Sequence, residues 1–134
     1  MPAYVISKIK DIIYEENITN PVIAILGVAY KGNIDDTRET PALKLIKLCE
    51  RKGWDIRIHD PHVKKFEYQL MSLDLAIKGA DLIVIETDHE EFCALDAGFM
   101  SHLVRHKLIL DLRNILSIEA FVKEGFTVRK LGGI

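Results

Sequence analysis

The sequence predicts an α/β fold in which a mainly parallel sheet lies between two layers of helices. Two observations support this prediction. Short apolar runs rich in Val and Ile alternate with segments of helical period, and the connections between them are short. Strands and helices that alternate in this way form parallel sheets through right-handed crossovers. The expected class is therefore a three-layer, Rossmann-like sandwich, preceded by an N-terminal helix.

The N-terminal helix and the first strand follow from apolar patterning. Residues 4–16 are predicted to be helical, because Val5, Ile9 and Ile12 recur on one helical face. This helix precedes the first strand and is not a crossover, so it either docks on the sheet or belongs to an interface. Residues 22–26 are continuously apolar, as expected for a central strand that is covered on both faces.

The second helix is predicted over residues 41–52 from the residues at its ends. Thr40 can serve as the N-cap, Pro41 occupies the first helical position, and Gly53 follows the last turn. A strand over 54–59 comes directly after it.

The rest of the chain continues the alternation of helices and strands. We predict helical stretches over 73–78, 90–95 and 118–123, and strands over 82–86, 107–112 and 126–129. We expect the chain to divide into an N-terminal helix, residues 1–20, and a Rossmann-like α/β domain, residues 21–134.

Composition excludes several classes of function. Of the 134 residues, 49% are hydrophobic and 28% are charged, as in a globular domain. The net charge of −2 does not suit a nucleic-acid partner, and no apolar run is long enough to span a bilayer. We therefore expect neither a nucleic-acid nor a membrane partner. Two cysteines do not make a disulfide framework, so we expect a cytoplasmic protein.

The loop after the first strand matches no standard phosphate-binding motif. Residues 27–32 fit G-x-x-x-x-G, but Asn33 and Ile34 stand where a Walker A motif needs Lys and Ser or Thr. Ala29 replaces the second glycine of the dinucleotide fingerprint. Taken alone, this pattern fits a packing turn as well as an anion site at a helix N-terminus.

A longer stretch of the same loop resembles a known family. Residues 27–42, Gly-Val-Ala-Tyr-Lys-Gly-Asn-Ile-Asp-Asp-Thr-Arg-Glu-Thr-Pro-Ala, are similar to the opening of the C-terminal domain of UDP-glucose/GDP-mannose dehydrogenases. Those enzymes are NAD-dependent nucleotide-sugar 6-dehydrogenases. The resemblance continues through residues 1–5, 60–61, 87–92 and 109–114, and so covers essentially the whole chain.

The resemblance implies roles for three cations. Lys31 matches a lysine that contacts the UDP-sugar, and Arg113 matches an arginine that also reaches this substrate. Arg38 matches an arginine on the NAD side of the cleft. Lys and Arg suit a diphosphate ester, Lys as a compact charge and Arg as a bidentate donor. Acidic residues of the same loop are expected to counterbalance these cations or to hold the loop: Asp35, Asp36 and Glu39.

The resemblance also implies that this stretch is part of a larger enzyme. The family carries an NAD domain with a glycine fingerprint and a central domain with a nucleophilic cysteine. Neither is recognisable here. Cys49 and Cys93 lack the glycine-rich surroundings of that nucleophile and are interpreted as small buried or half-buried hydrophobes. We therefore expect UDP-sugar binding without catalysis, with NAD held mainly by a domain outside this chain and a homo-oligomer only as the full-length enzyme.

Other polar residues receive weaker interpretations. Asp60 ends the second strand, where it could bind a ribose, but a structural role in the Asp-Pro turn is favoured. The five histidines lack convincing third and fourth ligands, so no metal site is predicted. Residues 88–90, Asp-His-Glu, resemble family members that act on N-acetylated UDP-hexosamines.

Two alternative functions stay open on the sequence. One is a stand-alone interaction or regulatory module of the same fold, and the other is a NAD- or CoA-binding domain with a degenerate fingerprint. An interaction module has no need for Lys31, Arg38 and Arg113 to converge, so their placement separates the alternatives.

Overall fold

Five parallel strands form a single sheet in the order β2-β1-β3-β4-β5. The computed structural model describes residues 2–38 and 40–130. The strands are β1 (Val22–Leu26), β2 (Asp55–His59), β3 (Leu82–Ile85), β4 (Leu108–Asp111) and β5 (Thr127–Lys130). The helices are α1 (Pro2–Glu15), α2 (Pro41–Arg51), α3 (Leu73–Ile77), α4 (Glu90–Cys93), α5 (Ala97–Ser101) and α6 (Ile118–Lys123).

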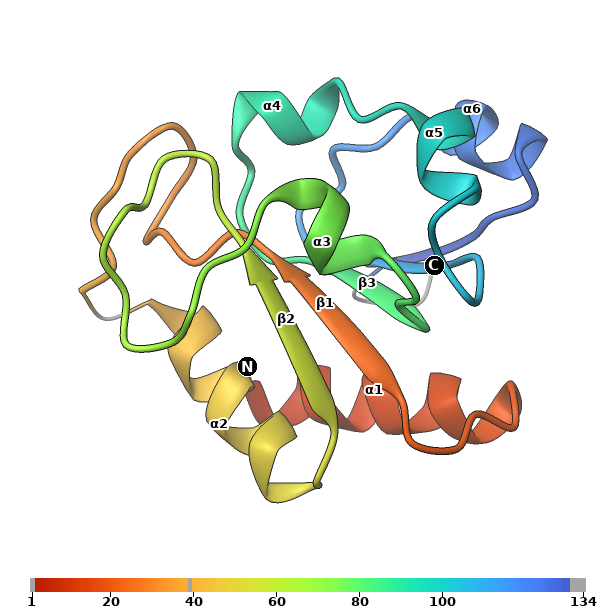
Figure 1. Cartoon of the computed structure of the whole chain (residues 1–134), viewed down its shortest axis with the longest axis horizontal. Coiled ribbons are helices and arrows are strands. Elements are labelled where there is room, and N and C mark those ends of the chain that lie inside the picture. Colours follow the sequence, from red (N-terminus) through yellow and green to blue (C-terminus); the bar gives the residue numbers. More distant parts are fainter. Residues whose placement is uncertain (1, 39, 131–134) are drawn as a thin grey trace.

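The helices cover both faces of the sheet, so the predicted three-layer sandwich is confirmed. Figure 1 shows α1 and α2 beneath the sheet and α3 to α6 above it. Because successive residues of a strand point to opposite faces, β1 contributes to both cores. Ile23 and Ile25 belong to the core under α1 and α2, whereas Ala24 and Leu26 belong to the core on the opposite face.

The N-terminal helix docks on the sheet. Val5, Ile9 and Ile12 are 5%, 0% and 1% exposed and pack in the same core as β1 and α2. Burying each of these side chains contributes about 1.5–3 kcal/mol relative to leaving it exposed. The alternative in which this apolar face stays uncovered to form an interface is therefore wrong. No helix in the described part of the chain is long and apolar enough to cross a membrane.

The capping residues mark where the helices begin, as predicted for α2. One short helix, α5, was not predicted from the sequence. The hydroxyl of Thr40 accepts a hydrogen bond from the amide of Ala42, and so Thr40 caps α2 as predicted. The missed helix, α5, is capped by the carboxylate of Asp96, which accepts from the amide of Phe99. Its five residues include Gly98, a poor helix former, so neither its length nor its composition indicated a helix.

The strand order defines one special place at the carboxyl edge of the sheet. β1 lies between β2 and β3, so the chain leaves β1 toward one neighbour and later returns to the other. In open parallel sheets, ligands bind at such a switch point, outside the carboxyl ends of the strands. The loops after β1, β3 and β4 therefore frame the candidate site.

Candidate functional site

Buried polar residues gather at the carboxyl edge of the sheet. Among the described residues, seven polar or charged side chains are buried, and all except Asp81 lie at this edge: Thr40, Asp60, Glu86, Thr87, His89 and Asp111. A buried polar group is unfavourable unless it is hydrogen-bonded, so such a cluster indicates an organised polar structure.

The loop after β1 lies directly against the segment that follows β3. Gly27 has φ +100°, and a Cβ at this position would lie 2.4 Å from the Cβ of Thr87. A Cβ at Gly32 would lie 2.5 Å from the carbonyl oxygen of Asp88. Both positions therefore require glycine, because atoms of Thr87 and Asp88 occupy the space that a Cβ would need.

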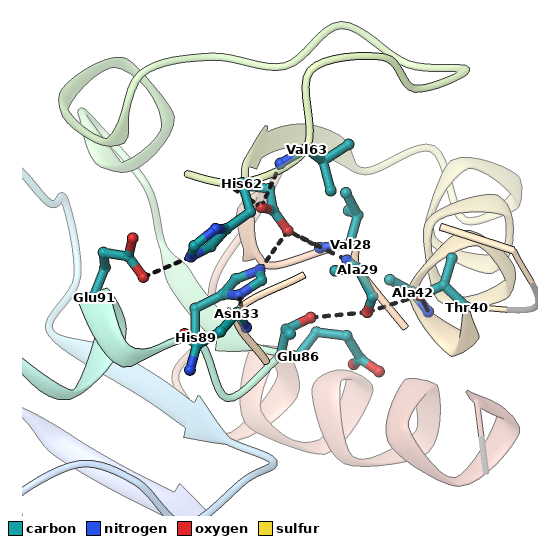
Figure 2. Close-up of polar contacts among 12 residues, drawn as sticks. Val28, Ala29, Asn33, Thr40, Ala42, His62, Val63, Glu86, His89 and Glu91 are labelled. Carbon is teal, nitrogen blue, oxygen red and sulfur yellow. Dashed lines mark hydrogen bonds and ion pairs between the residues drawn. The ribbon is translucent and has the colours of Figure 1, made fainter. Parts of the chain in front are cut away.

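His89 fastens the far end of the same loop. Its Nδ1 accepts a hydrogen bond from the amide of Asn33 at 2.8 Å, and its Nε2 lies 2.8 Å from a carboxylate oxygen of Asp60 (Figure 2). Because Nδ1 is an acceptor here, the ring proton belongs on Nε2, which donates to Asp60. The side chain of Asn33, which has φ +62°, in turn accepts from the amide of Glu90. The imidazole is completely buried.

Asp60 fastens the near end of the loop and the turn after β2. Besides His89, its carboxylate accepts from four amides: those of Val28, Ala29, His62 and Val63 (Figure 2). Burial raises the pKa of Asp60, but these donors outweigh burial, and the pKa is lowered from its ordinary value. Five donors leave this carboxylate no capacity for a ribose hydroxyl. The structural role predicted for Asp60 is confirmed, and it extends well beyond the Asp-Pro turn.

Lys31 and Arg38 lie on the loop that Asp60 and His89 hold. The side chain of Lys31 is exposed. The side chain of Arg38 is 88% exposed, and its guanidinium donates two hydrogen bonds to the carboxylate of Asp36, of 3.0 and 2.8 Å. These hydrogen bonds lower the pKa of Asp36 to about 2. Asp36 thus balances Arg38, as expected, whereas Glu39 lies outside the described residues.

Arg113 is positioned by the residue that ends β4. The buried carboxylate of Asp111 accepts hydrogen bonds from four successive amides: those of Arg113, Asn114, Ile115 and Leu116. Asn114 has φ +59°, a conformation that Asn tolerates better than most residues. The turn directs the Nε–H of Arg113 to the carbonyl oxygen of Glu86, at 2.9 Å. Arg113 therefore lies beside the carboxyl end of β3.

A pocket of about 200 Å³ opens beside Arg113 and Glu86. Its other lining residues are apolar and come from α1, α2 and the end of β4. The Oε2 atom of Glu86 is buried and has no hydrogen-bond partner among the residues that the structure describes. Burial raises the pKa of Glu86 to about 7, and the positive charge of Arg113 opposes this shift only in part. Glu86 is therefore an acid that gains or loses its proton near neutral pH.

The three predicted cations lie on two loops of one sheet edge. Lys31 and Arg38 share the loop after β1, and Arg113 lies on the loop after β4. Of the three, Arg113 lines the 200 Å³ pocket. Glu86, Asn33 and Asp111 were not predicted from the sequence to be functional residues. Glu86 and Asp111 lie at the carboxyl ends of predicted strands, and Asn33 lies in the loop after one. These positions were the available sign, because ligands in parallel sheets meet the carboxyl ends of strands.

The two cysteines differ from each other. Cys49 is buried in α2, and burial raises the pKa of its thiol to about 12, so it is an unreactive hydrophobe. Cys93, at the end of α4, is exposed. Its interpretation as a buried or half-buried residue is therefore wrong, because α4 turns only Phe92 into the core.

We expect a thiol reagent to distinguish these two cysteines. In the native chain, Ellman's reagent should react with one thiol, Cys93, and the second should react only after denaturation. A Cys93→Ser variant that shows no native reaction is the control. Rapid reaction of Cys49 in the native chain would contradict the burial described above.

The histidines at this edge have protein partners. His62 donates from Nε2 to Glu91 at 2.9 Å, and the Nδ1 of His59 lies 2.8 Å from the carbonyl oxygen of Met71. Within residues 2–38 and 40–130, no three His, Cys, Asp or Glu side chains are grouped so as to hold a metal ion.

Comparisons with known proteins agree on one family. Residues 24–118 match the profile of the UDP-glucose/GDP-mannose dehydrogenase family, UDP-binding domain. UDP-N-acetyl-D-mannosamine dehydrogenase of Methanocaldococcus jannaschii is 44% identical over 98% of this chain, and UDP-glucose 6-dehydrogenase of Rickettsia bellii is 36% identical over the same share. The chain spans 31% and 32% of the length of these relatives. The solved structure of UDP-D-ManNAc dehydrogenase from Pyrococcus horikoshii superimposes with a TM-score of 0.85 at 37% identity, covering 98% of this chain and 30% of that one.

Proposed function

Because this chain belongs to the UDP-glucose/GDP-mannose dehydrogenase family and matches its UDP-binding domain, we propose that it holds the nucleotide end of the substrate in an NAD-dependent UDP-sugar 6-dehydrogenase. The substrate is a UDP-hexose that the whole enzyme oxidises to a UDP-uronic acid. The relative at 44% identity acts, by its name, on an N-acetylated UDP-hexosamine, and a substrate of that kind is proposed here as well. NAD is bound mainly outside this chain.

One observation carries the proposal: Arg113 and the N-terminus of helix α2 adjoin the same pocket at the carboxyl edge of the sheet. Arg113 and Pro41, the first residue of α2, line the same pocket. The N-terminus of a helix bears partial positive charge, so α2 and Arg113 both favour an anion there. Lys31 lies on the loop that leads toward α2. Together these groups suit the diphosphate of a nucleotide sugar.

The proposed roles divide among the three cations. Arg113 offers a planar donor set to the diphosphate and Lys31 a compact charge, so both are assigned to the substrate. Arg38 is assigned to the NAD side of the site in the whole enzyme. Its pairing with Asp36 holds the guanidinium near the loop without burying it.

Calorimetric titration with UDP tests this assignment. The chain should bind UDP with a dissociation constant in the micromolar-to-millimolar range, about −4 to −8 kcal/mol. Lys31→Ala and Arg113→Ala should each weaken binding by about tenfold or more, because each removes a charge-assisted hydrogen bond. The matched controls are Lys47→Ala and Arg51→Ala, two exposed cations of α2.

Two results would contradict the proposal. One is the absence of UDP binding by the wild-type chain, which would favour an interaction module. The other is equal binding by the Lys31 and Lys47 variants. NADH production by this chain alone with any UDP-hexose would show that the oxidation does not need the domains that the relatives possess in addition.

A further inference from the structure

Lys31 lies within a short span of the loop after β1 that is fixed on both sides. Before it, the amides of residues 28–29 donate to the carboxylate of Asp60, at 2.8 and 3.2 Å. After it, the amide of Asn33 donates to Nδ1 of His89 at 2.8 Å. The side chains of Asp60 and His89 are both completely buried, and they are joined to each other at 2.8 Å (Figure 2). Both ends of the span are therefore attached to one buried pair.

The segment that holds the far side of the span comes from the neighbouring strand. His89 follows β3, whereas Asn33 follows β1, and 56 positions separate them in the sequence. Asn33 forms a second hydrogen bond with this segment, because its side chain accepts from the amide of Glu90 at 2.8 Å. A Cβ at Gly32 would lie 2.5 Å from a carbonyl oxygen of the same segment. The segment after β3 thus determines where the loop runs.

An imidazole suits this position because its two ring nitrogens play different roles. Nδ1 accepts from a backbone amide, so the ring proton belongs on Nε2, which donates to Asp60. The hydrogen bond at one ring nitrogen fixes the tautomer, and so the role that the other nitrogen can play. Asp60 therefore holds the ring of His89, and the ring holds the backbone of Asn33.

A fixed backbone matters here because the side chain of Lys31 is long and exposed. Its ammonium is a compact charge on a flexible stem, so binding an anion already requires this side chain to become ordered. Ordering the loop at the same time would weaken binding further, and a loop that is held in advance avoids this loss. The exposed side chain thus contributes charge, and the buried pair contributes order.

We propose that His89 is a positioning residue for the ligand: its imidazole holds the backbone at Asn33, so that Lys31 meets a phosphate group in one fixed place. His89 is 0% exposed, so it acts through the loop and not by contact with the ligand. The identity of that ligand, a UDP-sugar, rests on the proposed function. A buried histidine on the segment after β3 thus sets the affinity that Lys31 provides.

Two substitutions separate the two hydrogen bonds of His89. Glutamine carries its amide at about the position of Nε2, so His89→Gln can donate to Asp60 but cannot accept from Asn33. Asparagine carries its amide at about the position of Nδ1, so His89→Asn does the reverse. Each variant loses one buried hydrogen bond, and urea denaturation should therefore show a similar loss of stability in both.

Calorimetric titration with UDP should distinguish these two variants. His89→Gln frees the loop at Asn33 and should weaken binding about tenfold or more, as Lys31→Ala does, whereas His89→Asn should stay within about threefold of the wild type. The double variant with Lys31→Ala and His89→Gln should bind no more weakly than Lys31→Ala, because the position of a residue no longer matters once its charge is gone. His102→Gln, the same substitution at an exposed histidine, is the control and should bind as the wild type does. Equal binding by the two His89 variants, or full additivity in the double variant, would overturn the positioning role and keep nucleotide binding.

A measurement without nucleotide separates the role of His89 from the proposed function. In ¹⁵N relaxation of the ligand-free chain, the amides of Lys31 and Gly32 should become mobile on the ps–ns timescale in His89→Gln but not in His89→Asn. Rigid amides in both variants would overturn the positioning role, whether or not UDP binds. A mobile loop in His89→Gln, together with no binding of UDP to the wild-type chain, would contradict the nucleotide function and keep the positioning of the loop by His89.

Discussion

Replacing Asp60 by asparagine is expected to lower the free energy of unfolding by about 3–5 kcal/mol. One carboxylate oxygen accepts from Val28, Ala29 and His89, and the other accepts from His62 and Val63. Whichever oxygen becomes an NH₂ group then faces donors instead of supplying an acceptor. Both side-chain partners, Asp60 and His89, are fully buried, so water cannot replace the lost bonds.

Urea denaturation at neutral pH measures this loss. Asp55→Asn is the matched control, because Asp55 is exposed on the same strand and forms a surface ion pair with Arg57, worth at most about 1 kcal/mol. The lowered pKa of Asp60 also determines how the free energy of unfolding depends on pH. The contribution of ionised Asp60 to stability is present above the ordinary carboxyl pKa and is lost as the pH falls through the lowered value. A loss of less than about 1 kcal/mol in Asp60→Asn would contradict its role in holding the loop.

Replacing Glu86 by glutamine is expected to stabilise the chain at alkaline pH. Burial raises the pKa of Glu86 from 4.5 to about 7, so the folded state binds more protons than the unfolded state between these values. The stability of the wild type therefore falls as the pH rises through this window, and the full penalty applies above it. The shift corresponds to about 3 kcal/mol, and a glutamine, which does not ionise, avoids this penalty.

Chemical denaturation at two pH values tests this expectation. At pH of about 8, Glu86→Gln should be more stable than the wild type by up to about 3 kcal/mol, whereas near pH of about 4 the two should nearly coincide. Glu16→Gln, a substitution of an exposed glutamate that directly follows α1, is the control and should show no such trend. A difference that does not change with pH would contradict ionisation of Glu86 in the folded chain.

These two residues show opposite outcomes of burying a carboxyl group at the carboxyl edge of the sheet. Asp60 lies in a buried position where five donors compensate its charge, so it stabilises the loop that carries Lys31. Glu86 lies in a buried position where no residue of the described ranges forms a hydrogen bond with Oε2, so it destabilises the folded state once ionised. An uncompensated buried carboxyl is more often found in a binding site than in a structural core.

Local sequence features predicted most of the fold. Apolar period and capping residues act within a few residues of one another, and therefore the strands and α2 could be placed to within a residue or two. The missed helix, α5, has five residues, including a glycine, and is held mainly by its Asp96 cap and by the burial of Ala97 and Met100. Its formation depends on packing, which no local pattern reports.

The sequence by itself determined the α/β class, the family resemblance and the chemical nature of the candidate site, because the motif with Lys31 and the segment with Arg113 are local patterns. The tertiary structure decided which polar residues are buried and what they contact. His89 and Asn33 are 56 positions apart, and Glu86, at the end of β3, lines one pocket with residues of α1 and α2. Hydrogen bonds and desolvation depend on distances in space, and these distances exist only after the chain has folded.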